Sequence, residues 1–200
     1  MKRKIYLLPL VLLMVVAFVA CDETEEVDKY HDWKARNEAF VDSLQQVFDA
    51  NPLGELQCFP DSRDQRVKIF YKVIEEGDKS QQRPFLTSTA KAYYRGILID
   101  EAIFGLSKEK YYTRLWKEVG AFDSNFSGDD PDPSFDTATD FFINESGLRN
   151  GFREALQRMY PGARWEVYIP YQSGYGTSDY GSIPAYSTLI FDITLVSVEY

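Results

Sequence analysis

The residues from 148 to 195 constrain the fold most, because one helical period and two strand periods follow one another there. Apolar side chains recur first at every third or fourth position, at Leu148, Phe152, Leu156 and Met159. That spacing predicts a helix with one apolar face, which Pro161-Gly162 would end. Apolar residues then alternate in 165–169 and again in 189–195. The pattern predicts an α+β fold in which an antiparallel sheet lies across one helix.

Three earlier segments have the character of strands. Alternation begins after Arg66, at Val67, Ile69, Tyr71 and Val73. It returns in 91–98, and residues 140–143 predict a short strand. The segment 99–121 is long for a connection between strands, and we interpret it as an insertion with a short helix. Residues 127–139 are rich in Asp, Pro, Ser and Gly, which predicts a mobile loop.

Residues 30–49 predict an amphipathic helix, since Trp33, Phe40, Leu44 and Val47 are spaced by seven, four and three. The proline and glycine of Asn51-Pro52-Leu53-Gly54 would end it. Its apolar stripe can pack on its own domain, pair with a second copy or bind a client protein. Packing on its own domain is the default expectation.

The N-terminus has the character of an export signal. Lys2, Arg3 and Lys4 precede an apolar run from Ile5 to Ala20, which is short for a bilayer span and suits a secretory signal peptide. Phe18-Val19-Ala20-Cys21 resembles a bacterial lipoprotein cleavage box, so Cys21 is the predicted site of lipidation. An uncleaved anchor helix is the alternative. Both readings predict a domain outside the cytoplasmic membrane. The lipoprotein reading places it in the bacterial cell envelope, as a lipid-anchored periplasmic or surface-exposed outer-membrane protein.

A run of acidic residues follows Cys21, at positions 22–26. We expect it to be a disordered tether, and it also resembles a surface-export signal of Bacteroidetes lipoproteins. Cleavage would remove three positive charges and no negative one, so the formal net charge would fall from −9 to about −12. So acidic a chain is a poor partner for nucleic acid, and its predicted contact with the membrane is through the Cys21 lipid.

Several kinds of catalytic site are excluded by the residue counts. Once Cys21 carries a lipid, only Cys58 remains, so no intrachain disulfide is expected. His31 is the only histidine, which leaves no His/Cys cluster for zinc and no Ser-His or Cys-His pair. No glycine loop that would cradle a phosphate occurs. We therefore predict neither a metal nor a cofactor.

Short motifs follow one another in a characteristic order along residues 66–199. They are Tyr94-Arg95-Gly96, Phe122-Asp123-Ser124, Gly151-Phe152, Pro161-Gly162, Tyr168-Ile169-Pro170, Gly174-Tyr175-Gly176, Ser182-Ile183-Pro184 and Leu189-Ile190-Phe191-Asp192. That order resembles the FKBP-type peptidyl-prolyl isomerases. The resemblance implies an FKBP-like sheet wrapped across one helix, and a substrate of proline-containing or unfolded polypeptide.

The same resemblance implies the site residues. The expected catalytic set is Tyr94, Phe122, Asp123, Phe152, Tyr175 and Phe191, and the expected substrate-binding set is Leu148, Ile183 and Tyr180. The sequence departs from the family pattern at three positions. Phe152 stands where tryptophan is usual, Arg149 where isoleucine is usual, and Thr139 where an aromatic residue is usual. An alternative register would bring Phe142 near the site in place of the missing aromatic.

The expected organisation is a signal peptide at 1–20, a lipidated Cys21 with its tether at 21–29, a helical extension at 30–65 and an FKBP-like domain at 66–200 with an insertion at about 99–121. The predicted activity is isomerisation of X-Pro bonds during the folding of exported proteins. The alternatives are an FKBP-like module that binds proline peptides with little turnover, and a structural lipoprotein with a vestigial pocket.

Overall fold

The computed structural model describes residues 28–200, and residues 32–200 form one compact unit. The predicted signal peptide, the lipidation of Cys21 and the acidic run at 22–26 lie outside the described residues and stay predictions. None of the helices within residues 28–200 is long and apolar enough to cross a lipid bilayer.

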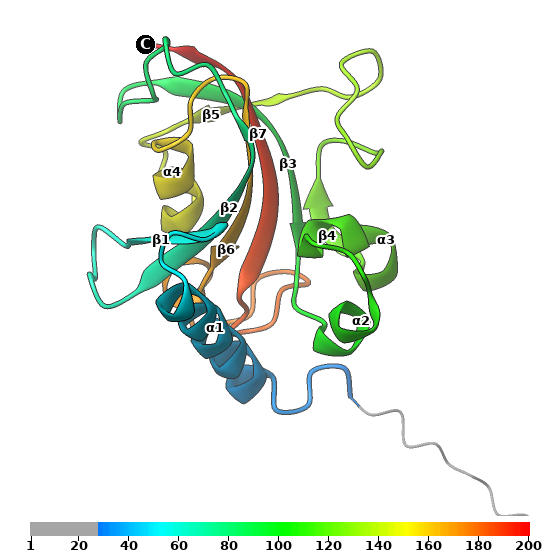
Figure 1. The fold of residues 1–200 in the computed structure, drawn as a ribbon. Helices are drawn as coiled ribbons and strands as arrows, with labels where there is room; N and C mark the ends of the chain where they lie inside the picture. Colours follow the sequence, from blue (N-terminus) through cyan, green and yellow to red (C-terminus); the bar gives the residue numbers. More distant parts are fainter. Residues whose placement is uncertain (1–27) are drawn as a thin grey trace, which may run out of the picture. The chain divides into compact units, whose positions relative to one another are not determined.

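A single antiparallel sheet of seven strands organises the unit (Figure 1). Its strands are β1 (Leu56–Pro60), β2 (Lys68–Glu76), β3 (Thr89–Ile97), β4 (Ala121–Ser124), β5 (Thr139–Phe142), β6 (Ala163–Ile169) and β7 (Leu189–Glu199). The order across the sheet is β1-β2-β6-β7-β3-β4, and β5 pairs with the first half of β3. The two strands predicted most clearly by alternation, β6 and β7, are therefore central. The α+β expectation is confirmed.

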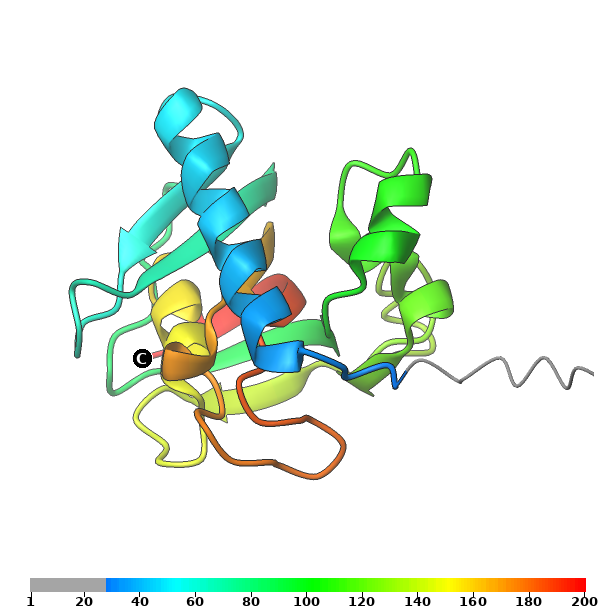
Figure 2. The ribbon, with the colours of Figure 1, turned by 90° about the horizontal axis from the view of Figure 1, so that it is seen from below.

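Helices cover both faces of this sheet (Figure 2). They are α1 (Trp33–Ala50), α2 (Glu101–Leu106), α3 (Trp116–Val119) and α4 (Asn150–Leu156), with 3-10 turns η1 (Tyr112–Leu115) and η2 (Tyr171–Ser173). Helix α4 lies on one face, whereas α1 and the segment 99–121 lie on the other. We call these the α4 face and the α1 face.

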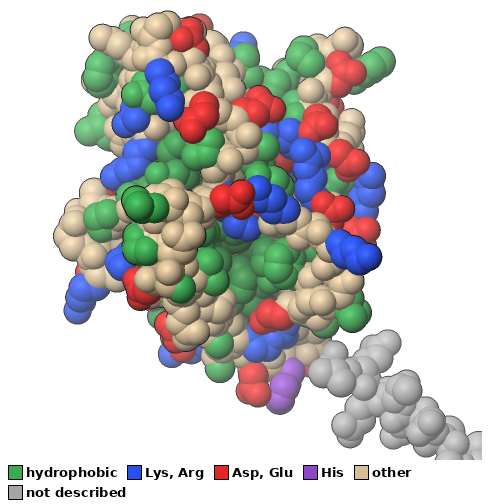
Figure 3. All heavy atoms as spheres, viewed as in Figure 1, with side chains coloured by type: hydrophobic (Ala, Val, Ile, Leu, Met, Phe, Trp, Pro, Cys, Tyr) green, Lys and Arg blue, Asp and Glu red, His purple; other side chains and the backbone are tan. Residues whose placement is uncertain are grey.

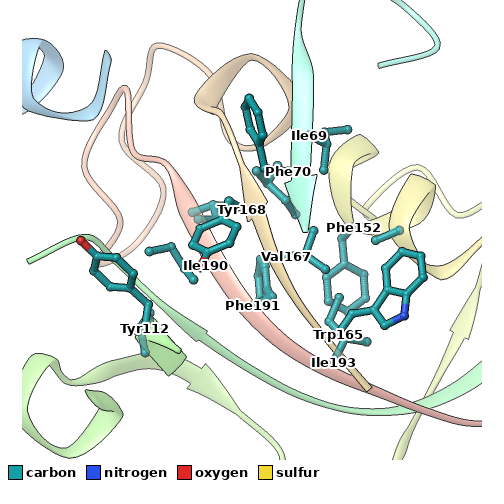
Figure 4. Packing of buried hydrophobic residues seen from close by; sticks show 14 of the residues in the cluster. Ile69, Phe70, Tyr112, Phe152, Trp165, Val167, Tyr168, Ile190, Phe191 and Ile193 are labelled. Atoms are coloured by element: carbon teal, nitrogen blue, oxygen red, sulfur yellow. The ribbon is translucent and has the colours of Figure 1, made fainter. Parts of the chain in front are cut away.

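Close approach of α4 to the sheet depends on Gly151. A Cβ atom there would lie 2.3 Å from Cγ2 of Ile169 on β6, too near for any real side chain. Since glycine has no Cβ, the first turn of α4 can pack directly on the strand. Phe152, the next residue, then points toward β6 and β7, where it meets Phe191 (Figure 4).

Helix α1 packs on its own domain, as the default expectation had it. Trp33, Phe40 and Leu44 are buried, and the ring centroids of Phe40 and Tyr168 are 6.1 Å apart. The Trp33 indole N–H donates to Oγ of Ser187 at 2.9 Å, far along the chain. Val47 departs from the predicted stripe, because its side chain is 57% exposed. The apolar face turns instead toward Val41 and Phe48, which pack against the core.

The α1 face buries charges, which the alternation in residues 165–169 did not predict. Every residue of β6 is buried, including Arg164 and Glu166. Arg164 donates two hydrogen bonds to the Asp192 carboxylate, at 2.9 and 2.6 Å. Glu166 accepts the backbone N–H and the hydroxyl of Thr113, both at 2.8 Å. Residues far away in the sequence supply further partners for these buried groups, since Arg164 also contacts Asp129 and Asp130.

The remaining strand and helix predictions divide into matches and departures. Strands β2, β3 and β5 lie where alternation predicted them. The segment 30–65 is not helical throughout, because it also contributes β1, which pairs with β2 from Leu56↔Lys72 to Pro60↔Lys68. The insertion holds α2, η1 and α3 rather than one short helix, and residues 127–138 contain no helix or strand. The mobility of that loop and the domain boundary at 65/66 stay predictions.

Candidate active site

Gly96 on β3 makes room for two aromatic rings on the α4 face. A Cβ atom at this position would lie 2.3 Å from Cζ of Phe122 and 2.7 Å from Cε1 of Phe191. Gly96 pairs with Phe191 across β3 and β7 and with Asp123 across β3 and β4. The Phe122 and Phe191 rings therefore pack directly against Gly96 of the Tyr94-Arg95-Gly96 motif, where any larger residue would collide with them.

Six phenyl and phenol rings line a cavity of about 160 Å³ on this face. The Phe152 ring lies 5.0 Å from Phe191 and 5.2 Å from Phe141, centroid to centroid. Phe122 meets Phe191 edge to face at 5.6 Å, and Tyr94 meets Phe152 edge to face at 5.9 Å. Edge-to-face contacts place ring edges against π faces, which stabilises such a cluster beyond its area burial.

Tyr94 and Asp123 form one hydrogen-bonded polar pair in the wall. The Tyr94 hydroxyl donates to Oδ2 of Asp123 at 2.9 Å. Burial, together with this hydrogen bond, raises the pKa of Tyr94 well above its usual value. The hydroxyl therefore stays protonated throughout the neutral range and continues to hold the Asp123 carboxylate at the rim.

Tyr175 closes the cavity from the loop after η2. Burial raises the pKa of its phenol, and the hydroxyl makes no hydrogen bond to any residue in 28–200. Its ring stacks on Tyr180, with centroids 4.2 Å apart and planes 17° apart. A protonated hydroxyl without a partner at the mouth of an apolar cavity can donate a hydrogen bond to a bound carbonyl.

The structure brings most of the predicted residues together. The cavity is lined by Tyr94, Phe122, Asp123, Leu148, Phe152, Tyr175 and Phe191. Two predicted substrate-binding residues are not in its lining. Ile183 is buried beneath the loop, and Tyr180 is 57% exposed on the outer side of Tyr175.

Phe141, Gly147 and Arg149 complete the lining. Arg149 was expected near the site as a departure from the family pattern, whereas Phe141 and Gly147 were not predicted. Phe141 pairs with Ala90 on β3 and lies 5.5 Å from the Tyr94 ring. The expected substitute, Phe142, is 47% exposed and points away. The register of β5 with β3, which pairs Phe141 with Ala90, decides which of the two rings faces the cavity.

A buried polar cluster holds α4 in place under the cavity. Asp61, 2% exposed, accepts the Arg63 backbone N–H at 2.7 Å and the Ser173 hydroxyl at 2.5 Å. It also accepts the side-chain amide of Asn150, the first residue of α4, at 2.9 Å. Burial alone would raise the pKa of Asp61, but the Arg63 guanidinium, 3.0 Å away, and these hydrogen bonds outweigh burial and lower the pKa well below its usual value.

A larger hollow, of about 530 Å³, opens on the α1 face between α1 and the segment 99–121 (Figure 3). Its lining is mainly apolar and includes Phe40, Leu44, Val47, Leu56, Phe104, Tyr112 and Tyr168. An ion pair between Arg36 on α1 and Glu101 on α2, at 2.6 Å, joins its two walls. No group of three His, Cys, Asp or Glu side chains suited to a metal ion occurs in residues 28–200.

A known protein family covers the part of the chain that forms the aromatic cavity. The family model for FKBP-type peptidyl-prolyl cis-trans isomerases matches residues 80–196, more than half of the chain. The chain belongs to the FKBP-type isomerase family. The matched residues contain the aromatic cavity entire, from Tyr94 to Phe191, whereas α1 and β1 lie before the FKBP match.

Individual relatives agree with this assignment. A Trypanosoma cruzi protein named macrophage infectivity potentiator is 39% identical over 92 residues, 46% of this chain and 42% of that protein. A Legionella longbeachae protein named outer membrane protein MIP is 31% identical over 130 residues, 64% of this chain and 43% of that protein. This FKBP-type chain thus spans less than half the length of either relative.

The fold likeness reaches further along the chain than the family match. The crystal structure of FkpA from Escherichia coli superposes with a TM-score of 0.54 over 86% of this chain and 63% of that chain, at 21% identity. Identity this low supports the FKBP fold alone. That fold is the predicted one.

Proposed function

We propose that this FKBP-type domain catalyses cis-trans isomerisation of X-Pro bonds in polypeptides. The observation that carries the proposal is the cavity walled by Tyr94, Phe122, Phe152 and Phe191, with an unpartnered Tyr175 hydroxyl at its mouth. A proline ring offers apolar surface to aromatic faces, and the hydroxyl can hold the neighbouring carbonyl. The proline ring would thus bind to the aromatic walls, and the carbonyl on the other side of the rotating bond would bind to the Tyr175 hydroxyl.

The chemistry asks for little beyond such a cavity. Rotation about an X-Pro bond faces a barrier of about 18–20 kcal/mol, because amide resonance is lost on the way. The twisted amide is less dipolar than the planar amide. A water-poor aromatic cavity therefore favours the twisted amide over the planar ground state, and only that difference accelerates the reaction. No proton is transferred, so no base near neutral pH is required.

An isomerisation assay on the soluble form starting at Asp22, with a Leu-Pro peptide, tests the activity. Removing the Tyr175 hydroxyl by Tyr175→Phe should lower kcat/KM several-fold, because a hydrogen bond worth about 1 kcal/mol is lost in the transition state. Tyr171→Phe is the matched control, since Tyr171 lies on η2 outside the cavity. Wild-type rates at the uncatalysed level would exclude the isomerase.

A binding module without turnover is the second candidate, favoured by the smaller ring of Phe152 at the cavity floor. Such a module would bind the same peptide at the same site. Titration of the peptide alongside the assay separates the two, because a binding module shows saturation without acceleration, and Tyr175→Phe then weakens binding alone.

We further propose that the domain acts in the bacterial cell envelope on exported polypeptides, held by a lipid on Cys21. The basic and then apolar leader before Cys21 supports this, and so does a relative named as an outer membrane protein. Cys21→Ala should abolish uptake of labelled fatty acid and release the protein from the membrane fraction. A variant that stays in that fraction would identify the leader as a plain anchor helix.

A further inference from the structure

Arg149 is fixed at the mouth of the aromatic cavity. Its Nε and Nη2 atoms donate to the Gly147 carbonyl at 3.2 and 2.9 Å. Its guanidinium carbon lies 5.0 Å from the ring centroid of Tyr175 and 6.0 Å from that of Tyr180. Because those two rings stack on each other, the guanidinium rests against a rigid aromatic pair rather than moving freely in water.

The charge of Arg149 is not neutralised by any neighbour. No carboxylate of residues 28–200 lies within 4.0 Å of it, whereas Arg63 and Arg164 both have carboxylate partners. Its Nη1 atom makes no hydrogen bond to that part of the chain either. The other charged residue of the lining, Asp123, accepts the Tyr94 hydroxyl instead. The mouth of the cavity therefore contains a positioned guanidinium, that of Arg149, whose Nη1 can still donate hydrogen bonds to a ligand.

The size of the cavity determines which part of a bound peptide lies next to Arg149. Cavities that enclose whole small-molecule ligands usually measure about 300–1,000 Å³. The aromatic cavity measures about 160 Å³, which suits a proline ring and its amide but not the next side chain. The residue directly beside the proline must consequently lie at the mouth, within reach of Arg149.

We propose that Arg149 makes this domain select X-Pro substrates that carry Glu or Asp directly beside the proline. The inference rests on the isomerase function proposed above and names its substrate class. The planar guanidinium matches a carboxylate with charge-assisted hydrogen bonds, which isoleucine, usual at this position in the family, cannot make. The formal net charge of −9 opposes acidic peptides at long range, so the preference comes from the short contact.

Peptides that differ only in the residue beside proline test the selection: Glu-Pro against Gln-Pro, and Pro-Glu against Pro-Gln. Gln has the shape of Glu without its charge. For wild type we expect kcat/KM to be about threefold higher with Glu than with Gln in at least one of the two pairs, as an exposed ion pair allows. This advantage of Glu should shrink in high salt. The same peptides are titrated for binding, so that the ratio is read even without turnover.

Two variants separate contact from overall charge. Arg149→Met should bring the Glu/Gln ratio to one, in kcat/KM or in binding, whatever its rate with Gln-Pro peptides. Arg66→Met removes the same charge from an exposed side chain outside the cavity and should leave the ratio unchanged. Equal Glu and Gln values in wild type, or a ratio that survives Arg149→Met, would overturn the proposal. Loss of turnover with all peptides, but a retained binding ratio, would refute the isomerase and leave the acid selection standing.

Discussion

The side chains of β6 and β7 have different surroundings on the two faces of the sheet. On the α4 face, Phe152 and Phe191 meet in a ring cluster whose polar members are at the rim. On the α1 face, the same strands bury Arg164 against Asp192, with side chains 5% and 2% exposed. A change in a ring contact lowers the free energy of unfolding gradually, whereas removing one partner of a buried ion pair lowers it strongly, because the other charge stays buried and unpaired. The ring cluster that forms the site is therefore more tolerant of substitution than the buried Arg164–Asp192 pair.

Breaking the charged face should give the largest effect. Arg164→Leu leaves the Asp192 carboxylate buried without its guanidinium, and the free energy of unfolding should fall by about 3–5 kcal/mol. Denaturant unfolding measures this. Lys91→Met is the control, because its pair with Asp140 is 47% and 63% exposed, and the expected loss is below about 1 kcal/mol. A similar small loss for Arg164→Leu would contradict the comparison.

The polar cluster beneath α4 should come next. Asp61→Ala removes an acceptor shared by Arg63, Asn150 and Ser173, with an expected loss of about 2–3 kcal/mol. Because folding lowers the pKa of Asp61, its contribution is complete above the unfolded pKa of about 3.9 and disappears as the pH falls through the folded value. Urea unfolding across acidic pH should therefore show a shallower decline for the variant than for wild type.

Asp140→Ala supplies the control for that experiment, since Asp140 pairs with Lys91 at the surface and its side chain is 63% exposed. It should leave both the stability and its acid dependence close to wild type. If Asp61→Ala declines as steeply as wild type at low pH, another carboxylate is responsible for the acid sensitivity.

On the aromatic face, Phe152→Trp should act mainly on rate. Phe152 borders a cavity, so the larger ring can extend into it and gain contact with a bound proline. A few tens of Å² of apolar contact correspond to about 1 kcal/mol, or several-fold in kcat/KM. The assay is paired with a thermal melt, because overpacking would instead cost about 1–3 kcal/mol of stability. A lower melting temperature without faster isomerisation would refute Phe152 as the cavity floor.

The smallest effect should be that of pH on the rate. Burial and its bond to Asp123 raise the pKa of Tyr94, and the mechanism transfers no proton, so kcat/KM should vary less than about twofold between roughly pH 6 and pH 9. A bell-shaped profile measured on a Leu-Pro peptide would show that a titrating group takes part. The two pH experiments thus distinguish an effect of protonation on the catalytic rate from an effect on the stability that Asp61 provides.

Sequence reasoning succeeded where the determinants are local. The spacing of Phe152 and Leu156 placed α4, and alternation placed β6 and β7. The order of short motifs gave seven lining residues of the cavity, although their catalytic roles stay predictions. Gly96 shows why such an order is informative, because this glycine of β3 is needed to make room for the Phe122 and Phe191 rings, which come from two other strands.

It failed where distant segments decide the outcome. Strand β1 is short, ends in Pro60 and lacks alternation, so nothing local marked it. The burial of Glu166 depends on Thr113 and Lys72, which lie far away in the sequence. Whether Phe141 or Phe142 faces the cavity is a matter of register with β3, and a shift of one residue exchanges the two faces.

The central position of β7 has a consequence for how the chain folds. β7 lies between β6 and β3, and it is the last strand in the sequence. β2 pairs with β6 across roughly ninety residues, and β3 pairs with β7 across a similar span. Such non-local pairing slows folding, since long loops must close before contacts reward them. The sheet cannot assemble until residues 189–199 are available, so a chain ending at Ser187 should remain unfolded instead of forming part of the domain.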